Sequence, residues 1–204
     1  MTASGLATQG AMLAHLRSVT RPAHHAMEGG LGLLDKHLGL ATYTGILARF
    51  YGFWRGWQPQ VAALLHDEPF LRPRRRLHLL AADLAALGVT GTALDGLPRC
   101  PLTTLAGDRE ALGSLYVMEG STLGGRLIQR NVAHCLGEDG RASCAYFTGY
   151  GNETGAMWGS FLARLEEASA SDMERVGGGA TATFERIGWW LSSVGATQIR
   201  ATGF

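Results

Sequence analysis

Apolar residues recur at three- and four-residue steps along much of this chain, the spacing of amphipathic α-helices. The longest such segment, Tyr43 to Leu64, predicts a core helix. No segment alternates apolar and polar residues over a length useful for a β-strand. We therefore expect an all-α fold, a single-domain helical bundle. The apolar stripe of the core helix is Tyr43, Ile46, Leu47, Phe50, Trp54, Trp57, Val61 and Leu64.

The same spacing predicts a first helix from about Gly10 to Met27, with Pro22 as a kink. The pair Gly29–Gly30 is expected to cap its end. Residues 1–9 are small and polar, so we expect a disordered tail ahead of one domain spanning residues 10–204.

Turn-forming residues interrupt the pattern in the second half of the chain. We expect Val89–Thr104 and Gly137–Gly155 to be surface loops, and Ala156–Ala168 and Met173–Val194 to be helices. The run Gly177–Gly179 predicts a break in the last helix, because glycine is a poor helix former.

Three arginines, Arg74–Arg76, follow Pro73 at the start of another predicted helix, which Gly88 closes. Cations on a first helical turn oppose the helix dipole. We therefore interpret this run as a solvent-exposed face, with phosphate or propionate binding as the less favoured alternative.

The segment Leu112–Val132 is predicted to be helical on both sides of a glycine cluster, Gly120, Gly124 and Gly125. Each glycine inside a helix costs about 1 kcal/mol relative to alanine, or about 3 kcal/mol for the three. That cost indicates backbone close to another backbone or to a flat ligand. A tight helix crossing, or a loop between two shorter helices, explains the spacing without a ligand. The apolar positions expected near one face are Leu112, Leu115, Tyr116, Leu123, Leu127 and Ile128.

A second segment, Leu16–Glu28, places His24 and Glu28 one helical turn apart. Neutral imidazole is a common haem-iron ligand, and its other ring nitrogen normally needs an acceptor such as a carboxylate. The alternative is a partly exposed His–Glu pair near the end of a helix.

Together the two segments resemble the haem oxygenase family, particularly its bacterial branch. Met118–Gly125, MEGSTLGG, is similar to the glycine-rich distal helix of that family. Tyr146–Trp158 and Ala180–Leu191 resemble the linker and last helix of bacterial members, so the resemblance extends over most of the chain. The N-terminal pattern L-x-x-x-T-x-x-x-H-x-x-x-E is present as Leu16, Thr20, His24 and Glu28.

The resemblance implies a haem between the first helix and a glycine-kinked distal helix. His24 would be the axial iron ligand, and Glu28 would assist it. The catalytic backbone would be that of Gly120, Gly124 and Gly125, lying against the macrocycle. The implied reaction is O2- and reductant-dependent cleavage of haem b, as cofactor and substrate, to biliverdin, CO and free iron.

The distal segment Met118–Gly125 has no histidine or arginine, the residues that would favour peroxidase chemistry. It also departs from animal-type members, which carry an aspartate where this chain has Ser121. A hydroxyl can hydrogen-bond a water but cannot carry a negative charge. Bacterial relatives with glycine–serine at this point are also oxygenases, so the departure bears on proton delivery more than on the reaction.

Haem propionates need cations or hydroxyls at the pocket mouth. We expect Arg17, two turns before His24, and Tyr116, one turn before Gly120, to bind them. His25 is the rival iron ligand, but it lies about 100° from His24 around a helix, so only one of the two can face the haem. Further arginine candidates, which could equally be exposed helix residues, are Arg126, Arg130 and Arg164.

Composition excludes several other classes of protein. A net charge of +1 does not favour nucleic-acid binding. No run approaches the ~18 apolar residues of a membrane span, and the N-terminus lacks the features of a secretion signal. Cys100, Cys135 and Cys144 are typical of reduced thiols, so we expect a cytoplasmic protein. The family-level partners are a reductase or ferredoxin-like electron donor and a bacteriophytochrome that accepts biliverdin.

Two other functions remain open at this point. A non-enzymatic haem carrier or sensor on the same fold would fit Ser121 and the predicted break in the last helix. An all-α enzyme without haem, such as a thiamine-degrading hydrolase, is disfavoured because no cysteine lies in a recognisable nucleophile setting.

Overall fold

The structure, a computed structural model, describes residues 3–28, 31–102 and 104–192, although the side chains of residues 3–9 and 27–28 are outside this description. Within these ranges the chain forms α-helices and short 3₁₀ helices and no strand, which confirms the all-α class. The elements are α1 (Ala3–Glu28), α2 (Leu40–Leu65), α3 (Glu68–Leu71), η1 (Arg72–Arg74), α4 (Leu77–Ala86), α5 (Gly91–Asp95), α6 (Asp108–Gly120), η2 (Ser121–Gly124), α7 (Gly125–Ala142), α8 (Ala145–Thr148), η3 (Gly151–Glu153), α9 (Thr154–Leu165), η4 (Ala170–Asp172) and α10 (Met173–Ser192).

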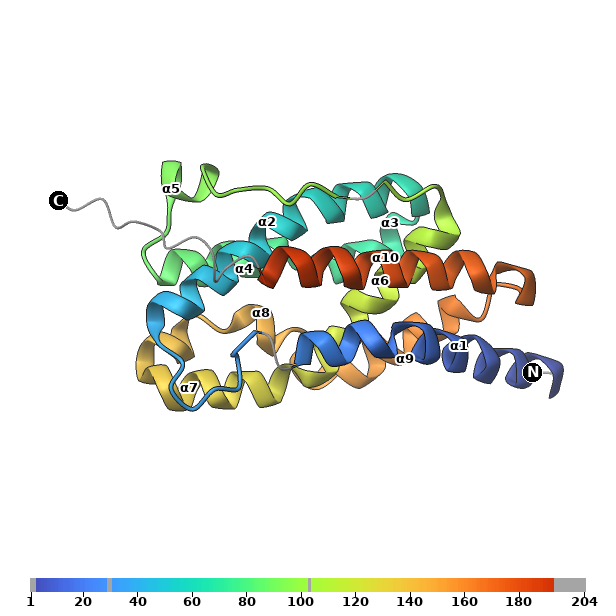
Figure 1. Ribbon diagram of the computed structural model, residues 1–204, viewed down its shortest axis with the longest axis horizontal. Helices are drawn as coiled ribbons and strands as arrows, with labels where there is room; N and C mark the ends of the chain where they lie inside the picture. The colour runs from blue at the N-terminus through green and yellow to red at the C-terminus, as the bar shows by residue number, and fades with distance from the viewer. Residues whose placement is uncertain (1–2, 29–30, 103, 193–204) are drawn as a thin grey trace.

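Helix α10 runs along the middle of the bundle in Figure 1, with much of α2 above it and α1, α7 and α9 below. It packs against α6 and α1, while α2 packs against α4 and α6. The predicted stripe of α2 forms much of the core: its residues are buried except Leu64, which is half-buried. Burial of that stripe is the main reason why α2 forms as one long helix.

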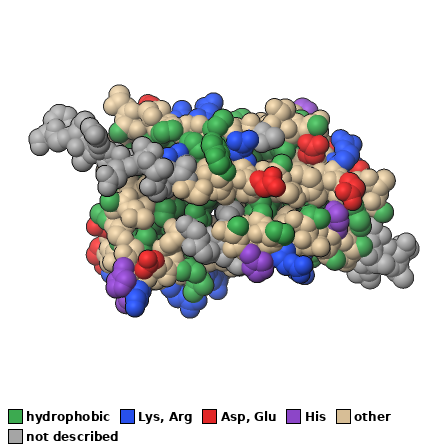
Figure 2. Space-filling view, in the orientation of Figure 1, with side chains coloured by type: hydrophobic (Ala, Val, Ile, Leu, Met, Phe, Trp, Pro, Cys, Tyr) green, Lys and Arg blue, Asp and Glu red, His purple; other side chains and the backbone are tan. Residues whose placement is uncertain are grey.

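The face drawn in Figure 2 carries charged side chains of both signs without a dominant patch of either. In the part of the chain that the structure describes, no helix is long and apolar enough to cross a membrane.

The closest helix crossing joins α6 to α10 and depends on glycine. A Cβ at Gly113 would lie 1.8 Å from the carbonyl oxygen of Val176, and one at Gly179 would lie 2.1 Å from that of Glu110. Helix α10 therefore continues through Gly177–Gly179, and the predicted break is wrong. The helix propensity lost at these glycines is offset by the backbone approach that they allow.

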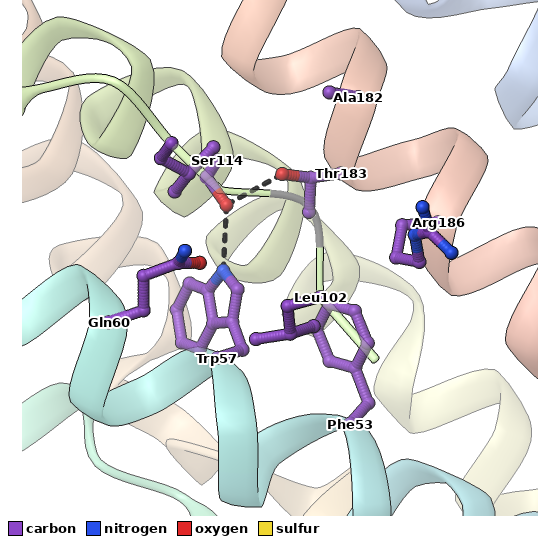
Figure 3. A pocket seen from close by; sticks show the side chains of 9 residues that line it. Phe53, Trp57, Gln60, Leu102, Ser114, Ala182, Thr183 and Arg186 are labelled. Atoms are coloured by element: carbon purple, nitrogen blue, oxygen red, sulfur yellow. Dashed lines mark hydrogen bonds between the residues drawn. The ribbon is translucent and has the colours of Figure 1, made fainter. Parts of the chain in front are cut away.

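A buried hydrogen-bond chain fastens the same helices to α2 (Figure 3). Trp57 Nε1 donates to Ser114 Oγ at 2.7 Å, and the hydroxyl of Thr183 lies 2.6 Å from the same oxygen. The neighbouring cavity of about 10 Å³ has room for no more than a water molecule.

Two predicted boundaries differ from the structure at the N-terminus. Helix α1 begins at Ala3, so residues 3–9 have a helical backbone where we expected a disordered tail. The predicted cap at Gly29–Gly30 lies outside the described residues, as do residues 193–194 of the predicted last helix.

The two predicted loops contain more regular structure than expected. The short helix α5 lies inside the first, and α7 continues past Gly137, whose φ of 60° and ψ of −127° mark a kink. Helix α8 follows because the buried carboxylate of Asp83 accepts bonds from the N–H groups of Ala145 at 2.7 Å and Tyr146 at 2.8 Å. Burial raises the pKa of Asp83, and these two bonds oppose that shift.

Candidate functional site

The C-terminal half of α1 carries both candidate iron ligands. The ring of His24 lies 5.8 Å from that of Phe184 on α10, at an angle of 69°, whereas the ring of His25 is 6.4 Å from His24 at 87°. Both histidines are exposed. The ring of His24 therefore lies on the side of α1 that meets α10. The side chain of Glu28 is outside the described residues, so its pairing with His24 stays a prediction.

Helix α1 meets α6 at the hydroxyl of Tyr116. The α1 residues involved are Thr20, one turn before His24, and Arg17, two turns before it. Burial raises the pKa of Tyr116, and a hydrogen bond with Thr20 and the nearby charge of Arg17 oppose that shift. Thr20 is itself buried, and its hydroxyl donates to the carbonyl of Leu16 at 2.7 Å. The structure thus brings together Arg17 and Tyr116, the two side chains predicted to bind propionates.

The three glycines of the distal segment have different surroundings. A Cβ at Gly124 would meet nothing within 4 Å, and one at Gly120 would meet only the ring of Trp158 at 4.0 Å. At Gly125, by contrast, a Cβ would lie 2.1 Å from the carbonyl oxygen of Phe147 on α8. Packing against α8 therefore accounts for Gly125, so this glycine needs no ligand to explain it. Gly120 and Gly124 present open backbone.

The two helices continue past one shared contact. His24 follows Thr20 by one turn, and Gly120 follows Tyr116 by one turn, about 6 Å along each axis. In Figure 1 α1 and the segment α6–η2–α7 run in the same general direction, so both residues lie beyond the contact on the same side. Figure 2 shows the surface hollowed beside the C-terminal end of α1, with hydrophobic side chains in the hollow.

Two leucines beside the open glycines are exposed. Leu123 is 53% and Leu127 52% exposed, while Leu112 and Leu115 on the same segment are buried. The expectation of one apolar face from Leu112 to Ile128 is therefore wrong. The 3₁₀ turn η2 rotates the chain by about 120° per residue instead of 100°, which turns the later leucines away from the core. Open backbone next to exposed leucines is a surface that a flat apolar ligand would cover.

The exposed side chain of Ser121 lies at the break between α6 and η2. Its hydroxyl donates to the carbonyl of Met118 at 2.7 Å, so its proton is engaged within the helix. The oxygen keeps lone pairs with which it can accept a hydrogen bond from water.

The weaker arginine candidates do not join Arg17 and Tyr116. Arg126 is exposed and donates to Asn152 of η3 at 3.0 Å. Arg164 forms ion pairs with acidic side chains at 3.7 and 2.6 Å, and Arg130 is exposed.

Sequence reasoning missed two buried arginines. Arg74 is 4% and Arg76 2% exposed, so their assignment to a solvent-exposed face is wrong, although Arg75 between them is exposed. Arg76 donates to the carbonyl of Met118 at 2.6 Å, and Arg74 pairs with Glu119 at 3.5 Å. The available signal was Glu119, an acidic residue within an apolar helical segment, which needs a buried partner.

A different hollow lies between α1 and α10. It is a groove of about 340 Å³ whose lining includes His15, Gly178, Glu174 and Glu185. Its two carboxylates would repel the propionates of haem. The region between α1 and the distal segment, which holds Arg17, Tyr116 and the open glycines, is therefore the better candidate for haem.

Comparison with known proteins bears on the family. No protein-family model matches the chain. A protein described as "Heme oxygenase" from Xanthomonas campestris pv. campestris (strain 8004) is 31% identical over 141 residues, which cover 68% of this chain and 81% of that protein. The solved "Structure of Heme Oxygenase from Leptospira interrogans" has a TM-score of 0.75 at 15% identity and covers 89% of this chain and 98% of that one, a likeness of fold alone. On the strength of the Xanthomonas relative, together with the resemblance of motifs, the chain belongs to the haem oxygenase family.

Proposed function

We propose that this protein is an enzyme that cleaves haem, using O2 and an external reductant, to biliverdin, CO and free iron. Family membership supports an oxygenase, and the open backbone at Gly120 and Gly124 is the observation that carries the choice of site. We take haem b to be the substrate.

The residues present fit the requirements of haem. An imidazole is available at His24, open backbone at Gly124, and a cation with a hydroxyl at Arg17 and Tyr116. Haem, when bound, would supply both the carbon that is oxidised and the iron at which O2 is reduced. His24 would hold the iron, and the distal glycines would face the macrocycle from the other side.

Each side chain of the site would then have a specific task. A tyrosine phenol is protonated at neutral pH, so Tyr116 would redirect its one proton from Thr20 to a propionate, while Arg17 would supply the opposite charge. Leu123 and Leu127 would exclude water from the macrocycle edge once the ligand covers them. Ser121 Oγ, which already donates to Met118, would accept a hydrogen bond from a distal water and so orient it.

A non-enzymatic carrier is not favoured. One of its two arguments was a broken last helix, and α10 is continuous through Gly177–Gly179. The other, Ser121, remains compatible with catalysis because its oxygen can still orient water. We further propose a cytoplasmic location, a reductase or ferredoxin-like electron donor and a bacteriophytochrome as acceptor of biliverdin, all by analogy with the family.

The test is a single-pot reaction of purified protein with hemin. Wild type should develop a Soret band that disappears when reductant and air are added, leaving the absorbance of a bilin and releasing CO. A Soret band that persists under these conditions would indicate a carrier and contradict the proposed reaction. No Soret band at all would remove haem from this site.

A further inference from the structure

The break in the distal segment is a point where side chains, in addition to the backbone, bind main-chain carbonyls. At Ser121 the chain passes from the α6 helix into a 3₁₀ turn, which interrupts the regular bonding pattern. Ser121 donates to the carbonyl of Met118, and Thr122 donates to that of Glu119, both at 2.7 Å. These local bonds hold the break from within the segment itself.

A buried cation holds the same carbonyl from the interior. Arg76 Nη2 donates to the Met118 oxygen at 2.6 Å, and only 2% of this arginine is exposed. Its guanidinium lies over the rings of Trp54 at 5.0 Å and Tyr146 at 5.1 Å. Arg76 therefore ties the break to α2 and α8, two elements of the core.

The next residue of the segment is fixed by a second set of contacts. Glu119 is 2% exposed, accepts from the hydroxyl of Tyr150 at 2.7 Å and pairs with Arg74 at 3.5 Å. Burial raises the pKa of Glu119, and the Tyr150 bond and the charges of Arg76 and Arg74 oppose that shift. Arg74 also donates to the carbonyl of Met157 at 3.1 Å, which connects the cluster to α9.

Buried charges are an expensive way to stabilise a bundle, because apolar residues of similar volume often serve as well or better. What a cation and a carboxylate can add is one specific geometry of the backbone that they bind. Here that backbone is the turn at Met118 and Glu119, which directly precedes Gly120 and lies less than two turns before Gly124.

We propose that Arg76 is a positioning residue for the distal segment, because its hydrogen bond to the Met118 carbonyl keeps Gly120 and Gly124 at the separation from α1 that haem requires. The inference rests on the proposed function for the identity of the ligand. It assigns Arg76 no contact with haem or with the reacting atoms.

The test compares Arg76→Met and Arg76→Lys with Arg75→Met, a matched control at the exposed neighbour. Two properties are measured: amide hydrogen exchange of the 118–125 peptide in the protein without haem, and hemin affinity by Soret titration. Loss of a charge-assisted hydrogen bond should accelerate exchange in this peptide, and weaken hemin binding, by about ten-fold or more in Arg76→Met. In Arg76→Met, peptides from α10 should exchange at the wild-type rate. The Arg75→Met protein should match wild type in both exchange and hemin affinity.

Arg76→Lys keeps the charge but has a shorter reach, so it should show the same local acceleration even if Arg76→Met does not fold. Wild-type exchange and hemin affinity in Arg76→Lys would overturn the assignment. Equal acceleration in α10 and in the 118–125 peptide would also overturn it, since that result describes a loss of overall stability. If wild type binds no hemin, the proposed function fails, but the exchange data still decide whether Arg76 positions this segment.

Discussion

Gly113 lies on α6 and Gly124 on the 3₁₀ turn η2 that follows it directly, yet the two glycines have opposite surroundings. A Cβ at Gly113 would lie 1.8 Å from the Val176 carbonyl oxygen, whereas one at Gly124 would meet nothing within 4 Å. Gly113 is thus explained by the protein's own packing against α10. Packing does not explain Gly124, and glycine there forgoes about 1 kcal/mol of helix propensity.

The contrast separates two explanations that the sequence alone left open. A glycine cluster in a helix indicates either a close helix crossing or a flat ligand, and this segment contains both cases. Gly125 is of the first kind, because it faces the backbone of α8 at Phe147. Only Gly120 and Gly124 remain for a ligand, and both lie beyond the contact between Tyr116 and α1.

The largest effect is expected at the crossing. Gly113→Ala should destabilise the fold by about 3 kcal/mol or more, the upper end of overpacking costs, because the clash is with backbone and cannot be relieved by a rotamer change. Thermal unfolding followed by circular dichroism measures it. A melting temperature equal to that of wild type would mean that α6 and α10 can separate at little cost.

Gly124→Val should leave the fold intact and abolish or strongly weaken hemin binding. Valine is a better helix former than glycine, so the free energy of unfolding should stay level or rise slightly. Its branched side chain would occupy the space that the macrocycle needs, at a typical cost of about 1–3 kcal/mol in the haem-bound state. Hemin titration and thermal unfolding measure the two quantities separately.

The matched control is Gly178→Val, since a Cβ at Gly178 also meets nothing within 4 Å on a helix. Gly178 lines the groove between α1 and α10. Reduced hemin binding in Gly178→Val, with normal binding in Gly124→Val, would move the haem site to that groove.

A smaller effect is expected at Arg17. Arg17→Ala should weaken hemin binding or give a mixture of biliverdin isomers while keeping the axial bond. A charge-assisted hydrogen bond contributes about 1.5–3 kcal/mol, and less here because Arg17 is exposed. The exposed Arg130 provides the control as Arg130→Ala. Unchanged affinity and isomer composition in Arg17→Ala would remove Arg17 from the site.

Local periodicity was sufficient to predict α2 and the end of α4. The stripe of α2 follows a spacing that only one buried face explains, and Gly88, with φ of 83°, closes α4 as predicted. That Arg17 and Tyr116 lie near each other could also be anticipated, because both residues keep a fixed register to the family motifs.

The parts that could not be predicted depend on partners far away in sequence. Arg76 binds a carbonyl 42 residues later, and Arg74 binds one 83 residues later, so no local pattern distinguishes them from the exposed Arg75. Helix α10 is unbroken because Glu110, on another helix, lies against Gly179. In each case a tertiary contact outweighs the local preference.

The most direct measurement is the hemin spectrum of His24→Ala and His25→Ala beside wild type. We predict that His24→Ala loses the axial-ligand spectrum and the activity, because His24 lies toward α10 and one turn beyond the Thr20–Tyr116 contact. His25→Ala should retain both. If His25→Ala lost the axial-ligand spectrum while His24→Ala kept it, haem would not lie between His24 and the open glycines, and the central claim would be contradicted.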